Sequence, residues 1–392
     1  MTRTLSLIIP AHNAIQTIDS LLVSIVHSKK TPSFEVIIVD DASTDDTVNA
    51  IRHFVAGRWL SLRSQGEKPL IVHVQHVRMH DEKKKKSQRG GFPLTIVQLK
   101  ANHGPAYARN RGAGVARGNI LLFLDSDVEL FSDTLSRVGK AFEDLDLHAL
   151  TGVWDKKQKT KKFFPRFKAL RDWSYWIHER DQRGYYYLFS TRVAAIRRDL
   201  FHRLGGFDER YASASVEDIE FTYRVARRYA VIFDPKVRVR HEFEDFWPVA
   251  KKYFLRSREW SALYATRGKF DPVAATRAEA ITALSAVGII GSFVLWLGVS
   301  AVWGIGEQFK VAQVWRMGLP ELEVFLASCF LFFVSLHLFG VRKFLAFTYG
   351  EEGLGFSVKS FFMGLVLYLV IFAGAISFAF SRLRKTLQAL FR

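Results

Sequence analysis

The segment Ile120-Leu-Leu-Phe-Leu-Asp-Ser-Asp-Val-Glu129 carries the clearest structural signal in the chain. Its apolar residues 121–124 predict a strand that is buried on both faces, as the strands of parallel sheets are. Two carboxylates, Asp125 and Asp127, end this run, and an unpaired charge inside a packed sheet is too costly. We therefore expect both acids at the carboxyl edge of a parallel sheet, where open α/β sheets place their ligands.

The two acids at this edge have two interpretations. Hard oxygen ligands suit Mg²⁺ or Mn²⁺ that carries a phosphorylated ligand. The alternative is a strand followed by an acidic turn without a metal. A second strand-like run, residues 34–39, also ends in carboxylates, at Asp40 and Asp41, and this repetition favours the metal interpretation.

Strand and helix patterns alternate around this segment. Such alternation is typical of right-handed βαβ units and therefore of an α/β fold with a mostly parallel sheet. We expect Pro10 to end the first strand. The predicted strands are 5–9, 34–39, 70–74, 93–99, 120–124, 149–153 and 230–239. The predicted helices are 14–26, 47–55, 106–116 and 133–142.

The composition limits the class of protein. With 392 residues, 49% of them hydrophobic, the chain is long enough for two domains with a packed core. Its net charge of +18 indicates anionic partners, namely nucleic acid, an anionic membrane surface or phosphorylated substrates. Because Cys329 is the single cysteine, a disulfide framework and a Cys-based zinc site are excluded. The apolar run 5–9 is too short for a signal peptide.

Two basic segments stand out from the rest of the N-terminal half. Residues 62–92 break the alternation, and their Lys-rich part, 81–91, predicts a solvated surface insertion or a basic finger on anionic lipid. Residues 156–168 mix lysines with Phe163, Phe164 and Phe167. That mixture suits a membrane interface, a nucleic-acid groove or an ordinary surface.

Three apolar segments follow at 281–303, 324–339 and 361–380, and crossing a bilayer needs about 20 residues. Three in succession predict an integral membrane region, which explains the positive charge better than nucleic acid does, so we expect no nucleic-acid partner. The predicted organisation is a catalytic domain at 1–245, interfacial helices at 246–280 and a transmembrane region at 281–392.

The orientation of this region follows from its basic residues. Arg256, Arg258, Arg267 and Lys269 precede the first span, so the positive-inside rule places the N-terminal domain in the cytoplasm, at a bacterial-type plasma membrane. Three full spans would put Arg382 on the opposite side, against the same rule. Either the third segment is re-entrant or interfacial, or the signal before the first span dominates.

Six short motifs occur in one order along the first two-thirds of the chain. They are IIPAHN (8–13), VDDASTDDT (39–47), GPAYARNRG (104–112), LDSD (124–127), GGFDER (205–210) and VEDIEFTYR (216–224). Each alone is a weak signal. Together they make the chain resemble a family 2 glycosyltransferase with the GT-A fold, membrane-anchored and of the type that adds a single sugar.

The resemblance implies a site for a nucleotide-sugar donor. Pro10, Ala11 and Asn13 would line the nucleotide pocket, and Asp41 would accept a hydrogen bond from the base. Two further residues, Arg109 and Asn110, would lie near the donor, where an arginine offsets phosphate charge. Donor binding is also expected to involve Asp125.

The resemblance also implies a divalent metal, Mg²⁺ or Mn²⁺. Asp125 and Asp127 would hold it against the diphosphate, with Asp127 the more direct ligand. His241 would complete the set, unless it is an ordinary surface histidine. The metal would neutralise the charge that builds on the leaving nucleoside diphosphate.

The acceptor side is implied by the motifs further along. Asp218 would act as the general base for an acceptor hydroxyl, with Glu217 structural or acceptor-binding. Alternatively, both acids cap a helix, a role that is compatible with catalysis. Gly205 and Gly206 would form a turn that lets the acceptor approach the backbone, and Trp260 is placed on the same side.

Two departures from the family pattern refine the expected activity. His12 stands where an aromatic residue is usual, and Glu259 replaces an arginine of the motif that processive synthases carry before Trp260. We therefore expect one sugar to be moved to a lipid-linked or membrane-located hydroxyl. Polyprenyl-phosphate sugar synthases are the alternative, followed by processive polysaccharide synthases and by a non-enzymatic membrane scaffold.

Overall fold

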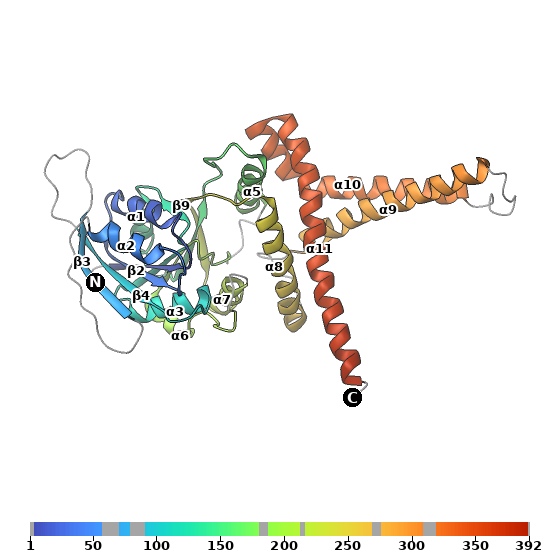
Figure 1. The fold of residues 1–392 in the computed structure, drawn as a ribbon. Coiled ribbons are helices and arrows are strands. Elements are labelled where there is room, and N and C mark those ends of the chain that lie inside the picture. The colour runs from blue at the N-terminus through green and yellow to red at the C-terminus, as the bar shows by residue number, and fades with distance from the viewer. Residues whose placement is uncertain are drawn as a thin grey trace. The chain divides into compact units, whose positions relative to one another are not determined.

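The structure, a computed structural model, describes residues 4–56, 70–78, 91–179, 187–211, 216–268, 276–308 and 319–390 (Figure 1). The chain divides into two compact units. The first consists of Met1–Ile177 and Asp181–Glu244, and the second of His178–Arg180 and Asp245–Arg392. The Lys-rich residues 81–90, predicted to form a surface insertion or a lipid-binding finger, lie outside the described residues.

The first unit is built on one mixed sheet, which has nine strands within the described residues. Its order is β3-β4-β2-β1-β5-β8-β7-β9-β6. The strands are β1 (Thr4–Ala11), β2 (Ser33–Asp40), β3 (Leu70–Arg78), β4 (Gly91–Gln98), β5 (Ile120–Leu124), β6 (Val128–Leu130), β7 (Ala149–Trp154), β8 (Val193–Arg197) and β9 (Val231–His241).

The longest parallel part of the sheet is the run β4-β2-β1-β5, as the alternating strand and helix pattern predicted, and β7 and β9 form a second parallel pair. The other strands make the sheet mixed, because β3 pairs antiparallel with β4, and β8 pairs antiparallel with both β5 and β7. The first strand continues through Pro10, which was predicted to end it, since Pro10 and Ala11 remain in register with Val39 and Asp40 of β2.

The helices of the first unit cover this sheet. They are α1 (Ile18–Val26), α2 (Thr47–Ala56), α3 (Pro105–Val115), α4 (Thr134–Ala141), α5 (Phe163–Ser174), α6 (Arg198–Arg203) and α7 (Glu217–Val225), and the π-helical turn η1 (Tyr175–Glu179) includes residues of both units. The helix predicted from Ala14 begins at Ile18, because the amides of Thr17 and Ile18 both donate to the Ala14 carbonyl and form a turn first. On α5, Phe164 and Phe167 are buried in the core, so the membrane-interface interpretation is wrong for these two aromatic side chains.

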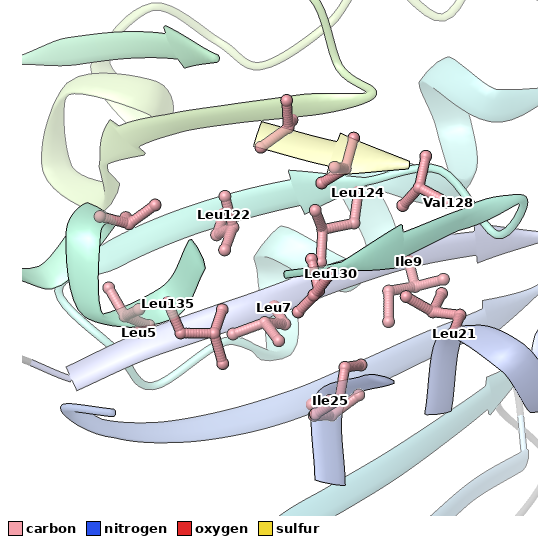
Figure 2. Packing of buried hydrophobic residues seen from close by; sticks show 14 of the residues in the cluster. Leu5, Leu7, Ile9, Leu21, Ile25, Leu122, Leu124, Val128, Leu130 and Leu135 are labelled. Atoms are coloured by element: carbon pink, nitrogen blue, oxygen red, sulfur yellow. The ribbon is translucent and has the colours of Figure 1, made fainter. Parts of the chain in front are cut away.

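Side chains of β1 and β5 alternate between two apolar clusters on the two faces of the sheet. On one face, Ile9 of β1 lies beside Leu21 of α1, in a cluster that also contains Leu7 and Leu122 (Figure 2). On the other, Ile8 and Phe123 pack beneath α3 and α7. All five residues of β5 are buried, which confirms the predicted burial of this strand on both faces.

The approach of α3 to the sheet is close. A Cβ atom on Gly112 would lie 2.6 Å from Cγ2 of Ile8, so only glycine lets the helix reach this depth. The orientation of α3 is therefore fixed against β1, and its N-terminal half is held above the carboxyl ends of the central strands.

The second unit consists mainly of the helices α8 (Phe246–Arg267), α9 (Arg277–Gln308), α10 (Leu319–Glu352) and α11 (Leu354–Leu390). Three stretches, Arg277–Val302, Glu321–Glu352 and Leu354–Gln388, are long and apolar enough to cross a membrane. The second and third contain the predicted segments 324–339 and 361–380, and the first covers the predicted segment 281–303 except for its last residue. Between α9 and α10, a buried hydrogen bond of 3.0 Å joins Ser285 Oγ and His337 Nδ1.

Candidate active site

The two acids after β5 lie at the carboxyl ends of the parallel strands, where the sequence placed them. Asp127 Oδ2 lies 3.2 Å from His241 Nε2. The short ribbon of β6 and β9 brings these side chains together, because Val128 pairs with His241 in its register. His241 is the last residue of β9, and its Nδ1 is buried without a hydrogen-bond partner in the described part of the chain.

Asp125 faces a different group. Its Oδ1 accepts a hydrogen bond of 2.8 Å from the Nη2 of Arg109 on α3. The Nη1 of the same guanidinium donates to Glu217 Oε1 at 3.0 Å. Only 3% of Arg109 is exposed, so two carboxylates from distant segments meet one buried cation. Burial alone lowers the pKa of Arg109, but the charges of Asp125 and Glu217 outweigh it, and the pKa is raised.

The adjacent acids Glu217 and Asp218 begin α7 and have different surroundings. Glu217 is buried against Arg109, whereas Asp218 is partly exposed and accepts the amide of Ile219 on its Oδ1 at 2.8 Å. Both lie in the first turn of α7, where the helix dipole stabilises negative charge. The predicted division of the pair, with one acid as the base and the other structural or acceptor-binding, stays a prediction.

The GGFDER motif forms a turn that is tied to α3. Gly205 and Gly206 have φ angles of 79° and 69°, which confirms the predicted turn. The side chain of Asn110 accepts the amide of Phe207 at 2.9 Å and donates to the Phe207 carbonyl at 2.8 Å. It also donates to Glu209 Oε1 at 2.9 Å. Asn110 therefore pairs with this turn.

The residues predicted to line a nucleotide pocket lie where β1 and β2 end. Asn13 Oδ1 accepts the amide of Thr44 at 2.8 Å, which joins the loops after the two strands. Asp41 is buried, and its two oxygens accept the amides of His103 and Gly104 at 2.9 and 2.7 Å. His12 Nδ1 lies 2.9 Å from the Asp41 carbonyl. Pro10 and Ala11 are the last residues of β1, beside this group.

One predicted acceptor-side residue belongs to the other unit. Trp260 lies on α8, and its ring centroid is 5.6 Å from that of Tyr264. Its predicted contact with an acceptor therefore stays a prediction.

The three predicted metal ligands do not form a ready-made cage. Within the described ranges, no group of three or more His, Cys, Asp or Glu side chains is arranged to hold an ion. Asp127 and His241 converge, while Asp125 is turned toward Arg109.

Sequence reasoning missed several partners at this site. Phe207 and Glu209 hold Asn110, and the amides of His103 and Gly104 hold Asp41. Three of these residues, Phe207, His103 and Gly104, make their contacts through backbone groups, which residue type does not reveal. The motifs GPAYARNRG and GGFDER, the second of which contains Glu209, could be recognised in the sequence, but they did not show which residues they contact.

A sequence-family model described as Glycosyl transferase family 2 matches residues 6–71 and 79–205. An uncharacterized glycosyltransferase of Bacillus subtilis is 28% identical over 39% of this chain and 30% of its own length. The dodecaprenyl-phosphate galacturonate synthase of Rhizobium johnstonii is 26% identical over 42% of this chain and 40% of its own length. The chain thus spans well under half the length of these two curated relatives.

A solved structure resembles nearly the whole chain. It is a mannosyltransferase from Pyrobaculum calidifontis in complex with GDP-Man and Mn²⁺. The alignment covers 97% of this chain and 87% of that one, with a TM-score of 0.51 and 17% sequence identity. This similarity confirms the predicted GT-A fold with long C-terminal helices.

Proposed function

The chain belongs to glycosyl transferase family 2, and from this premise we propose that it is an inverting, membrane-anchored enzyme. It moves one sugar from a nucleotide-diphosphate sugar to a hydroxyl group of a lipid-linked or membrane-located acceptor. The observation that carries the proposal is the ion-pair group around Arg109. Asp125 from the LDSD motif and Glu217, next to Asp218, reach the same guanidinium, so the donor-side and acceptor-side acids share one edge of the sheet.

On the donor side, the nucleotide lies against the ends of β1 and β2. Each oxygen of Asp41 accepts one backbone amide, and a carboxylate oxygen has room for a second donor. A base N–H can therefore bind Asp41 without breaking the loop. Pro10, Ala11 and Asn13 supply the neighbouring wall. The mannosyltransferase with GDP-Man supports a nucleotide-sugar donor by its similarity of fold.

Asp127 and His241 fit a divalent metal, either Mn²⁺ or Mg²⁺. Atoms that share an ion at about 2.1 Å each lie roughly 3 Å apart, close to the observed separation of 3.2 Å. Mg²⁺ is usually held by one or two carboxylates together with substrate phosphates, so a complete protein cage is not required. Bound there, with Asp125 nearby, the metal would offset charge on the leaving diphosphate.

On the acceptor side, Asp218 is the general base. Asp218 lies partly exposed in the first turn of α7, and a carboxylate is a group that can take a proton from an acceptor hydroxyl. Asp218 accepts the hydroxyl proton while the acceptor oxygen bonds to the anomeric carbon. The bond from that carbon to the nucleoside diphosphate breaks on the opposite face, so the configuration is inverted. Glu217 is committed to Arg109 and is therefore assigned a structural role.

The second unit supports an acceptor located in the membrane, because three of its helices are long and apolar enough to span a bilayer. The basic residues Arg256 and Arg258 on α8, which precede the first span, favour a cytoplasmic catalytic domain and contact with anionic lipid.

A phosphate acceptor is the second candidate, because one relative is a dodecaprenyl-phosphate galacturonate synthase. An ionised phosphate is already a nucleophile and needs no base. The role of Asp218 therefore separates the two candidates.

The test uses the full chain in nanodiscs, with uridine, guanosine and thymidine diphosphate sugars and either Mn²⁺ or Mg²⁺. Each donor is offered a lipid-linked sugar or a polyprenyl phosphate. With a hydroxyl acceptor, Asp218→Asn should lower kcat about 10²- to 10⁴-fold. Glu220→Gln is the control, because Glu220 lies on the same helix and forms a half-buried ion pair with Arg224 instead of Arg109. Full turnover by Asp218→Asn with a hydroxyl acceptor would refute the assigned base, and transfer to polyprenyl phosphate alone would favour the second candidate.

A further inference from the structure

Two consecutive side chains of α3, Arg109 and Asn110, contact three segments that lie far from them in the sequence. Arg109 reaches Asp125 after β5 and Glu217 on α7, which is 108 residues further along the chain. Asn110 reaches Phe207 and the turn around it, 97 residues away. One turn of helix therefore joins the donor-side acid to both acceptor-side motifs.

The charge around Arg109 is balanced by protein groups. The guanidinium side chain is 4% exposed and Glu217 is 5% exposed, whereas Asp125 is 28% exposed. Separate nitrogens of the planar fork serve the two carboxylates, so the spacing of Asp125 and Glu217 is set by the width of the guanidinium. A direct role in binding donor phosphate would require Arg109 to give up at least one buried ion pair, which is costly.

Asn110 fixes the turn in a comparable way. Its amide accepts from and donates to the backbone of one residue, Phe207, which defines the position and the orientation of that peptide. A Cβ atom on Gly206 would lie 2.6 Å from Asn110 Oδ1, so the turn packs directly on this amide. Arg109 and Asn110 lie just before Gly112, which packs directly on Ile8 of β1. The part of α3 that carries them is therefore held against the sheet.

We propose that Arg109 and Asn110 are positioning residues that set the distance between the donor-side and acceptor-side halves of the active site. Arg109 fixes the orientation of Asp125, two residues before the proposed metal ligand Asp127, and holds the start of α7, and with it Asp218. Asn110 places the Phe207 turn. This inference rests on the proposed function and replaces the phosphate contact that the sequence motif implied for Arg109.

The physical consequence is a distinction between the two residues. Since Asp125 acts through the metal, loss of Arg109 should weaken nucleoside diphosphate binding only when Mn²⁺ is present. Loss of Asn110 should leave that binding unchanged and impair transfer. A misplacement of about 1 Å costs on the order of 10²-fold in rate.

The experiment uses the full-length protein in nanodiscs with four variants. Arg109→Lys keeps the positive charge but loses the planar guanidinium, whose separate nitrogens bind the two carboxylates. The double variant Arg109→Met/Glu217→Gln removes the cation together with one buried charge, so the fold is not left with two unpaired carboxylates. Asn110→Ala removes the clamp on the turn. Arg203→Lys is the control, because Arg203 pairs with Asp199 on the surface.

Three measurements separate positioning from a purely structural role. Thermal unfolding reports the fold, calorimetry reports UDP and GDP binding with and without Mn²⁺, and steady-state kinetics report kcat and KM. We expect the folded Arg109 variants to bind nucleotide at least 10-fold more weakly with Mn²⁺, equally without it, and to lose about 100-fold in kcat. Asn110→Ala should bind nucleotide normally and lose kcat or raise the acceptor KM.

Two results would overturn the inference alone. One is an Arg109 double variant that melts earlier but keeps wild-type binding and kcat, which would make the pair merely structural. The other is an equal loss of nucleotide affinity without Mn²⁺, which would restore the direct phosphate contact. Wild-type protein that binds neither UDP nor GDP with Mn²⁺ would instead overturn the proposed function, and this inference with it.

Discussion

Substituting alanine at each of the two glycines of the GGFDER turn should have unequal effects. Gly205 and Gly206 share a left-handed backbone, with φ angles of 79° and 69°. A Cβ atom on Gly205 would meet no atom of the described residues within 4 Å, whereas on Gly206 it would lie 2.6 Å from Asn110 Oδ1. The pair therefore separates backbone strain from disruption of the Asn110 contact.

The magnitudes follow from these contacts. An L-residue in the left-handed region costs roughly 1–2 kcal/mol, which is the expected loss for Gly205→Ala. Gly206→Ala carries the same strain and also displaces Asn110 from the amide and carbonyl of Phe207, two hydrogen bonds with a net value of about 1 kcal/mol each. The second variant should be about 2 kcal/mol less stable than the first.

The assay is thermal unfolding of the purified full chain, with the transfer rate measured in parallel. For a unit of this size, 1 kcal/mol shifts Tm by about 2–4 °C, so the variants should differ by roughly 4–8 °C. Gly206→Ala should also lose transfer activity at temperatures where it is fully folded. Equal Tm values and equal rates for the two variants would show that Asn110 does not hold the turn.

Three further results are expected. Gly152→Ala should destabilise the first unit by about 1–3 kcal/mol, because its Cβ would lie 2.1 Å from the Val237 carbonyl oxygen of β9. A displaced β9 would also move the predicted metal ligand His241, so metal-dependent nucleotide binding should be weaker. Urea titration measures the first effect and calorimetry the second. Phe123→Ala should cost about 3–5 kcal/mol in a urea titration, since Phe123 is fully buried beneath α3. The pKa of Asp208 is lowered, chiefly by the hydrogen bond from Arg210. Because its folded pKa lies below the unfolded value, its stabilisation is present above about pH 4 and is lost as pH falls through the folded pKa. Asp208→Asn should therefore be less stable than wild type at pH 7, and the difference should shrink as the pH is lowered below about 4.

The central strands and the position of their acids could be read from the sequence. The run 121–124 is apolar without interruption, and this pattern has few structural solutions other than a strand covered on both sides. The acids after it then had to lie at the open edge. The same reasoning worked for β2 and Asp41, because local pattern and tertiary burial agree in parallel strands.

The antiparallel strands β6 and β8 could not be predicted from the sequence. β6 has three residues and β8 has five, and neither carries a turn signal or a long apolar run. Their place is decided by partners, since β8 fills the position between β5 and β7 and β6 lies at the edge on β9. Pairing of this kind depends on tertiary contacts that the local sequence does not encode.

The contacts within the site were the least predictable feature. The motifs named Arg109, Asn110 and Glu217, but residue type cannot tell whether an arginine faces a ligand or two carboxylates of its own chain. That difference depends on a helix docking at Gly112 and on a partner more than 100 residues away. The motifs predicted which residue types belong to the site, but the contact that each residue makes could be assigned only from the structure.

The ion pair between Arg109 and Glu217 also constrains the order in which the protein folds during synthesis. Helix α3 leaves the ribosome long before α7, because their paired residues are 108 positions apart. Until α7 arrives, Arg109 lacks one of its two anionic partners, and burying it under those conditions is unfavourable. We therefore expect α3 to dock fully only when α7 does, so that the first unit is completed in one late, cooperative step shortly before the first apolar helix emerges.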